Sequence, residues 1–131
     1  MTSGTDGTGH TAAERFAVAE DIGASEAVLR LSGELDHDTA PALRTALDRC
    51  ESAGSARILV DFSDLRFCDS TGLNVLLQAR ARAQERDGAV ELVGLGRGVA
   101  RVFDLTGAGT LFPRYATVAE ARSAGGPDPG R

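Results

Sequence analysis

Two hydroxyl residues directly follow an aspartate where an amphipathic segment begins, in the order Asp69, Ser70, Thr71 and Gly72. A serine at a helix start exposes its hydroxyl and lies beside backbone N–H groups that have no partner within the helix. A phosphate added to that hydroxyl is tolerated, because these donors and the helix dipole favour an anion. Ser70 is therefore a candidate phosphorylation site. An ordinary helix cap is the alternative, and position alone favours it.

A second polar turn, Gly33–Ala40, separates an apolar strand-like run from the next helical pattern. Its central residues Asp36, His37 and Asp38 suit turn and cap positions, and Asp38 is the better cap. A hydrolase triad of Ser70, His37 and an aspartate is disfavoured, because the G-x-S-x-G elbow is absent. Three adjacent residues rarely point at one ion. The sequence therefore predicts no enzyme activity, no cofactor and no metal site.

Composition excludes several further classes of function. All 14 basic residues are arginine, and the formal net charge of the chain is −5. Without lysine there is no Walker-A phosphate loop and no Schiff-base catalysis. An acidic chain with no basic run does not suit nucleic acid, and no stretch approaches the roughly 20 apolar residues of a membrane span. The first 13 residues hold no apolar signal core, which predicts a cytoplasmic protein. Cys50 and Cys68 fall in apolar periodic segments and are interpreted as reduced packing residues.

Along the chain, segments in which every second residue is apolar alternate with segments in which apolar residues recur every three to four positions. This alternation is typical of strands alternating with helices. Strands are predicted near 16–20, 28–31, 58–62, 90–93 and 111–115, and helices near 39–50, 70–86, 99–106 and 117–122. The second strand is expected to stop at Ser32-Gly33, and the third at a turn formed by Ser63-Asp64. A cap from Thr39 or Asp38 is expected to open the first helix.

These elements must position the two polar turns. The helix over 70–86 is expected to direct four apolar residues inward, Leu73, Leu76, Leu77 and Ala81. The pattern predicts the α/β class, a single domain over 14–123 with a mixed, mainly parallel sheet of about five strands and four to five helices. Residues 1–13 and 124–131 are predicted to be disordered tails, because they hold almost nothing to bury.

Three segments together resemble a known family: GELDHDTA at 33–40, DSTGL at 69–73, and VARVFDLTGAGTLFPRY at 99–115 followed by TVAEA. Either of the first two alone is a weak signal, but the three in this order and separation are specific. The chain resembles the anti-sigma factor antagonists of the STAS-domain family, from about Phe16 to Ala121.

The resemblance implies regulation by partner switching. The unphosphorylated protein would bind an anti-sigma factor that is also a serine kinase, and so free the sigma factor, as in stress responses. Phosphorylation of Ser70 would end that binding, and a PP2C-type phosphatase would restore it. Asp36, Asp69, Thr71 and Gly72 would form the environment of the switch. A STAS module that binds a nucleotide or small ligand, or a scaffold in a stress-signalling complex, remains the alternative.

The chain departs from the family pattern after DSTGL, where many members continue Gly-Leu-Gly and this chain has Asn74. Asn74, Gln78 and Arg82 are spaced by four residues and share one outward helix face. They are either a solvated stripe or the surface that selects the anti-sigma factor. The resemblance implies neither nucleic-acid binding nor membrane binding.

Overall fold

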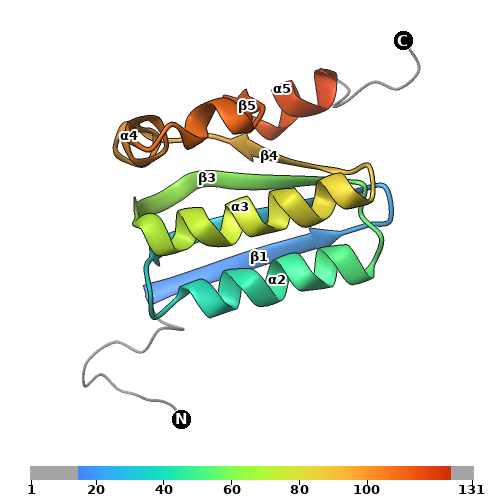
Figure 1. Cartoon of the computed structure of the whole chain (residues 1–131), viewed down its shortest axis with the longest axis horizontal. Coiled ribbons are helices and arrows are strands. Elements are labelled where there is room, and N and C mark those ends of the chain that lie inside the picture. The colour runs from blue at the N-terminus through green and yellow to red at the C-terminus, as the bar shows by residue number, and fades with distance from the viewer. Residues whose placement is uncertain (1–14, 125–131) are drawn as a thin grey trace.

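The computed structural model describes residues 15–124, which form one sheet with helices on both faces (Figure 1). In spatial order the strands are β1 (Phe16–Ile22), β2 (Glu26–Leu35), β3 (Arg57–Cys68), β4 (Ala89–Val93) and β5 (Arg114–Tyr115). The helices are α2 (Ala40–Ser52), α3 (Ser70–Glu85), α4 (Arg97–Leu105) and α5 (Val118–Ser123), with a 3₁₀ turn, η1 (Ala108–Leu111), before β5. β1 runs antiparallel to β2, and all other neighbours are parallel. The predicted α/β class is confirmed. The predicted tails lie outside the described residues, except for Ala124.

Two separate apolar layers cover the two faces of the sheet. The larger layer lies between the sheet and α2, α3 and α4, whose Leu47, Leu76 and Phe103 are buried. Figure 1 shows α2 and α3 lying side by side across this face. The smaller layer packs Ala121 of α5 against the opposite face, on Val28, Leu59 and Val93. We call the uncovered remainder of that opposite face the open face.

β3 is the central strand, and it is longer than predicted. Its run Ile58–Phe62 alternates between the two apolar layers, as expected for a strand covered on both faces. Ser63-Asp64 does not form a turn: the strand continues to Cys68 through two shifts in the pairing with β2. Such bulges tolerate polar residues and bend a strand without ending it. β2 likewise continues past Ser32-Gly33, because Gly33 adopts the positive φ of 91° that one irregularity requires.

Two smaller predictions need correction. Ala81 is exposed, whereas Ala79 and Ala83 carry the inward face of α3, because the helix turns by 100° per residue and places Ala81 between them on the outer side. The last strand is only Arg114–Tyr115, since Leu111 ends the 3₁₀ turn. The predicted span of α3 agrees with the structure to within one residue.

A buried ion pair holds α5 on the sheet. Arg57 Nη2 donates to Glu91 Oε1 at 2.8 Å, and it also donates to the carbonyl oxygen of Ala121 in α5. Arg122 of α5 donates from Nε to Glu26 Oε2 at 2.8 Å. Glu91 is completely buried, so its charge depends on Arg57 for compensation. Among residues 15–124, no helix is both long and apolar enough to cross a membrane.

Candidate functional site

The candidate site lies where β2 and β3 end, at the carboxyl edge of the parallel strands. The register pairs Leu35 with Cys68, and the Asp69 backbone N–H donates to the Leu35 carbonyl oxygen at 3.1 Å. The β2–α2 loop (residues 36–39) and the β3–α3 junction therefore lie next to each other. The two polar turns of the sequence meet at the edge where open α/β sheets place their binding residues.

Ser70 is the first residue of α3, and its side chain is exposed. Asp69 is the helix cap: its Oδ1 accepts hydrogen bonds from the N–H of Thr71 at 2.9 Å and of Gly72 at 3.4 Å. Thr71 is half-buried. Because Asp69 performs the capping, the ordinary cap interpretation of Ser70 does not hold. The serine hydroxyl is left on the surface, beside the positive end of the helix dipole.

Gly72 presses the first turn of α3 onto the ends of both strands. A Cβ at this position would lie 2.6 Å from Cγ and Cδ2 of Leu35 and 3.2 Å from Sγ of Cys68. Leu35 is fully buried and Cys68 nearly so, so neither side chain has free space to move into. Any residue larger than glycine at this position must displace the Leu35 side chain. The position of Ser70, two residues earlier, is therefore fixed by packing.

Asp36 organises the β2–α2 loop. Its Oδ1 accepts from the N–H of Asp38 at 2.9 Å and of Thr39 at 3.1 Å. Thr39 occupies the cap position of α2, but its buried hydroxyl donates to the Glu34 carbonyl oxygen at 2.9 Å and accepts from the Asp36 N–H at 2.8 Å. Neither Thr39 nor Asp38 supplies the predicted side-chain cap. The predicted cap lies two or three residues too late in the chain, since Asp36 closes an Asx turn just before the helix.

Arg15 belongs to the site and was missed from the sequence. Its Nη1 donates to Asp36 Oδ2 at 2.9 Å and to Glu34 Oε1 at 3.4 Å, and its Nη2 lies 3.6 Å from Asp38 Oδ2. The hydrogen bond from Arg15 is the main cause that lowers the pKa of Asp36 below its ordinary value. A single arginine before a strand carries no signal by itself. The antiparallel pairing of Phe16 with Gly33, had it been predicted, would have placed Arg15 next to Glu34.

The stripe predicted on α3 is not uniform. Asn74 and Gln78 are exposed, as their spacing implies. Arg82 is only partly exposed, because its Nε donates to Glu51 Oε1 at 3.0 Å and its Nη2 lies 3.5 Å from Asp48 Oδ1, both on α2. A partner that uses Arg82 must compete with these two carboxylates. The freely available part of the stripe is therefore its first two residues.

The remaining candidate groups have other surroundings. His37 is exposed on the β2–α2 loop, and within residues 15–124 no group of three His, Cys, Asp or Glu side chains could hold a metal ion. Cys50 and Cys68 are buried free thiols. Burial raises the pKa of Cys68 to about 12 and that of Cys50 to about 11, so both are protonated at neutral pH. Both cysteines serve packing, in agreement with the interpretation of the sequence.

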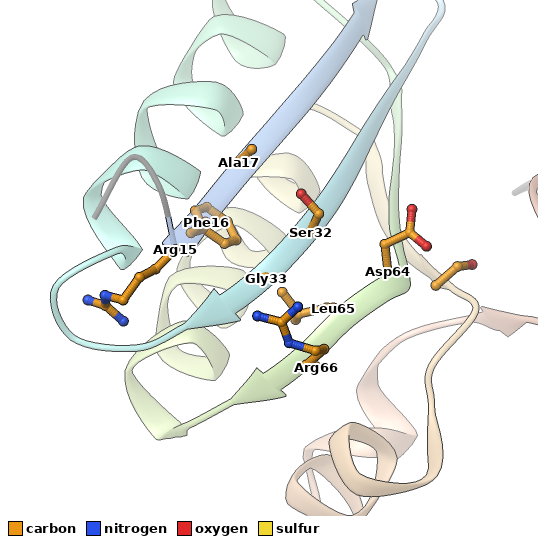
Figure 2. Close-up of a pocket in the computed structure, with 9 residues that line it drawn as sticks. Arg15, Phe16, Ala17, Ser32, Gly33, Asp64, Leu65 and Arg66 are labelled. Atoms are coloured by element: carbon orange, nitrogen blue, oxygen red, sulfur yellow. The ribbon is translucent and has the colours of Figure 1, made fainter. Parts of the chain in front are cut away.

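A shallow depression of about 580 Å³ lies on the open face, over the ends of β1, β2 and β3 (Figure 2). Ser32 and Asp64 face it from neighbouring strands, and Arg66 lies at its edge. Arg15 also borders the depression, but Figure 2 shows its guanidinium directed away from Ser32 and Asp64, in keeping with its ion pair to Asp36. The depression therefore holds the carboxylate of Asp64 and, at its edge, the guanidinium of Arg66, which is 3.9 Å from Glu34 Oε2.

The mixed five-stranded sheet with its helices has the fold of a STAS domain. The family model described as "Mlab, STAS domain" matches residues 18–113, and the chain belongs to this family. The resemblance inferred from the three sequence segments is confirmed.

Individual proteins of this family are similar to the chain in sequence and in structure. The anti-sigma F factor antagonist of Paenibacillus polymyxa is 30% identical over 89 residues, which cover 67% of this chain and 76% of that protein. The structure of the anti-sigma factor antagonist SpoIIAA in its unphosphorylated form has a TM-score of 0.73 and 26% identity, covering 86% of this chain and all of the other. The phosphorylated form of the Bacillus cell fate determinant SpoIIAA has a TM-score of 0.66 and 25% identity, covering 82% and 98%.

Proposed function

We propose that this protein is an anti-sigma factor antagonist that acts by partner switching in the cytoplasm. The unphosphorylated form binds an anti-sigma factor with serine kinase activity and so releases the sigma factor. Phosphorylation of Ser70 ends that binding, and a PP2C-type phosphatase reverses it. The protein itself performs no catalysis.

The observation that carries this proposal is that Ser70 is exposed at the start of α3, where packing fixes the position of the helix. Asp69 caps the helix and Gly72 locks its first turn, so the serine hydroxyl takes no part in holding the fold. A modification there leaves the domain intact and changes only its surface. The relative SpoIIAA has been solved in both an unphosphorylated and a phosphorylated form, and its fold is similar to this one in both.

The size of the effect is sufficient for a switch. A phosphate adds a charge of about −1.5 to −2 beside Asp69. The helix dipole and the first backbone N–H groups tolerate it within the domain. A partner docked over the same surface meets both repulsion and the cost of removing water from the phosphate. Losing about 3 kcal/mol of binding free energy weakens the complex roughly a hundredfold.

The test uses the purified full chain with each anti-sigma-type serine kinase of the source organism. Incubation with ATP followed by phosphopeptide mapping should place the phosphate on Ser70. Ser70→Ala should bind the same kinase and accept no phosphate, and Ser70→Asp should bind poorly. Ser63→Ala is the matched control, because Ser63 is also exposed but lies on β3, and it should be phosphorylated normally. Phosphate on Thr71 or Ser63 alone, or no kinase that binds the unmodified protein, rejects the proposal.

The charges around the depression on the open face give little support to the alternative of a nucleotide-binding module. A nucleotide phosphate needs donors or cations that are free to meet it. Arg15 points away (Figure 2) and is paired with Asp36, Arg66 lies 3.9 Å from Glu34, and Asp64 adds a negative charge. Purified protein that retains a nucleotide through gel filtration would reverse this preference.

A further inference from the structure

Phe67 is a large apolar side chain that the fold leaves on the surface. It exposes 49% of its area, although it lies near the end of the central strand β3. The register pairs Phe67 with Glu34 on the open face, whereas the next pair, Leu35 and Cys68, points into the larger core. Single exposed apolar residues are common, so exposure alone decides nothing. Phe67 is a candidate binding residue because it lies close to Ser70 in the chain.

Phe67 lies three residues before Ser70, across the tip where β3 ends and α3 begins. Three residues of extended chain span at most about 11 Å. A stable interface buries about 800 Å² on each partner, which corresponds to a patch on the order of 16 Å in radius. A partner that sits on Ser70 and extends over the edge of the sheet onto the open face therefore also covers Phe67. Phenylalanine is among the residues enriched at protein interfaces, and a few well-packed residues carry most of the binding energy.

The charges around this tip explain how a phosphate could control the aromatic contact. Four carboxylates lie at the edge of the site, on Glu34, Asp36, Asp38 and Asp69. The guanidinium of Arg15 is already engaged by three of them, and Arg66, 73% exposed, lies 3.9 Å from Glu34. The four carboxylates outnumber the two guanidiniums, so a phosphate on Ser70 adds negative charge to an edge that is already acidic. The phosphate therefore stays hydrated, and its water shell reaches the surface next to Phe67.

We infer that Phe67 is the apolar anchor of the docking surface, and that it enters a pocket on the anti-sigma partner only while Ser70 is unphosphorylated. This inference rests on the proposed function, because it takes the same partner. An aromatic ring is buried only when water leaves the contact. A phosphate dianion next to the ring holds its water, because removing water from a charged group costs free energy. Phosphorylation thus acts on the contact made by Phe67 as well as by direct repulsion.

The test measures the dissociation constant of the full chain with the anti-sigma kinase that binds it, by titration calorimetry. Phe67→Ala should weaken binding at least tenfold while its thermal unfolding temperature stays near that of the unmodified protein. Leu111→Ala is the matched control, since Leu111 is 43% exposed. Its carbonyl oxygen accepts from Arg80, ten residues along α3 from Ser70 and so about 15 Å away along the helix, which puts Leu111 at the rim of such a patch, where apolar contacts contribute little. Leu111→Ala should bind normally.

A double-mutant cycle tests the coupling. Ser70→Asp should weaken binding by a clearly smaller factor in the Phe67→Ala background than in the unmodified protein, because the contact it disturbs has already been removed. Equal factors in both backgrounds, normal binding by Phe67→Ala, or equal losses in Phe67→Ala and Leu111→Ala each overturn the inference. If the unmodified protein binds none of the kinases, the proposed function itself fails, which is a separate result.

Discussion

Replacing Gly72 by alanine isolates the packing that fixes the start of α3. The new Cβ would lie 2.6 Å from two atoms of Leu35, which is fully buried. Overpacking of this kind costs about 1–3 kcal/mol, whereas the gain in helix propensity from glycine to alanine is about 1 kcal/mol. The packing cost should prevail, and the variant should be less stable than the unmodified protein by up to about 2 kcal/mol.

Gly98→Ala provides the matched control for this experiment. Gly98 lies in α4, and a Cβ there would meet no atom within 4 Å, so this variant receives the propensity gain without the clash. The difference in unfolding free energy between the two variants therefore measures the packing cost alone, about 1–3 kcal/mol. Chemical denaturation monitored by circular dichroism can resolve it. If the unfolding free energies of the two variants differ by less than about 0.5 kcal/mol, Leu35 moves aside at little cost and packing does not fix the start of α3.

Three further outcomes are expected. The pKa of Asp36 is lowered in the folded state, so its stabilising contribution is present above the ordinary aspartate pKa and is lost as the pH falls through the lowered value. In denaturant titrations, the stability difference between the unmodified protein and Asp36→Asn should be complete above about pH 5 and shrink below pH 4; a pH-independent difference contradicts this. Arg57→Met should cost about 3–5 kcal/mol of unfolding free energy, because it leaves the buried carboxyl of Glu91 without its partner, and Glu91→Gln in the same background should recover part of that loss. Cys50 and Cys68 should react with a thiol reagent only in denaturant, and a thiol that reacts rapidly in the native protein would argue against their burial.

The sequence was informative wherever a local rule determines structure. The span of α3 follows from its apolar spacing, and Asp69 and Gly72 at its start are recognisable as motif residues. Bulges are different, because they depend on how two strands pair and leave no local pattern. The polar pair Ser63-Asp64 therefore suggested a turn, although Asp61 Oδ1 satisfies the Ser63 N–H at 2.9 Å within a continuing strand.

Long-range pairing also limited what could be inferred about the site. The ion pair between Arg15 and Asp36 joins residues 21 positions apart, and it becomes visible only when β1 and β2 are aligned. For the same reason Arg82 was expected to be free, because its partners on α2 are more than 30 positions away. Periodicity shows which face of a helix points outward, but it does not show which neighbouring element the side chain meets.

At the junction between β3 and α3, residues that stabilise the fold lie within a few positions of residues that are exposed for recognition. Asp69 and Gly72 hold the start of α3, so substitutions there lower the stability of the domain. Ser70, Asn74 and Gln78 are exposed, and substitutions at such positions usually change stability by no more than about 0.5 kcal/mol. Gene duplicates can therefore diverge at the exposed positions without losing the domain. A genome can carry many copies of this fold that differ in what they recognise, each with the same junction beneath its surface.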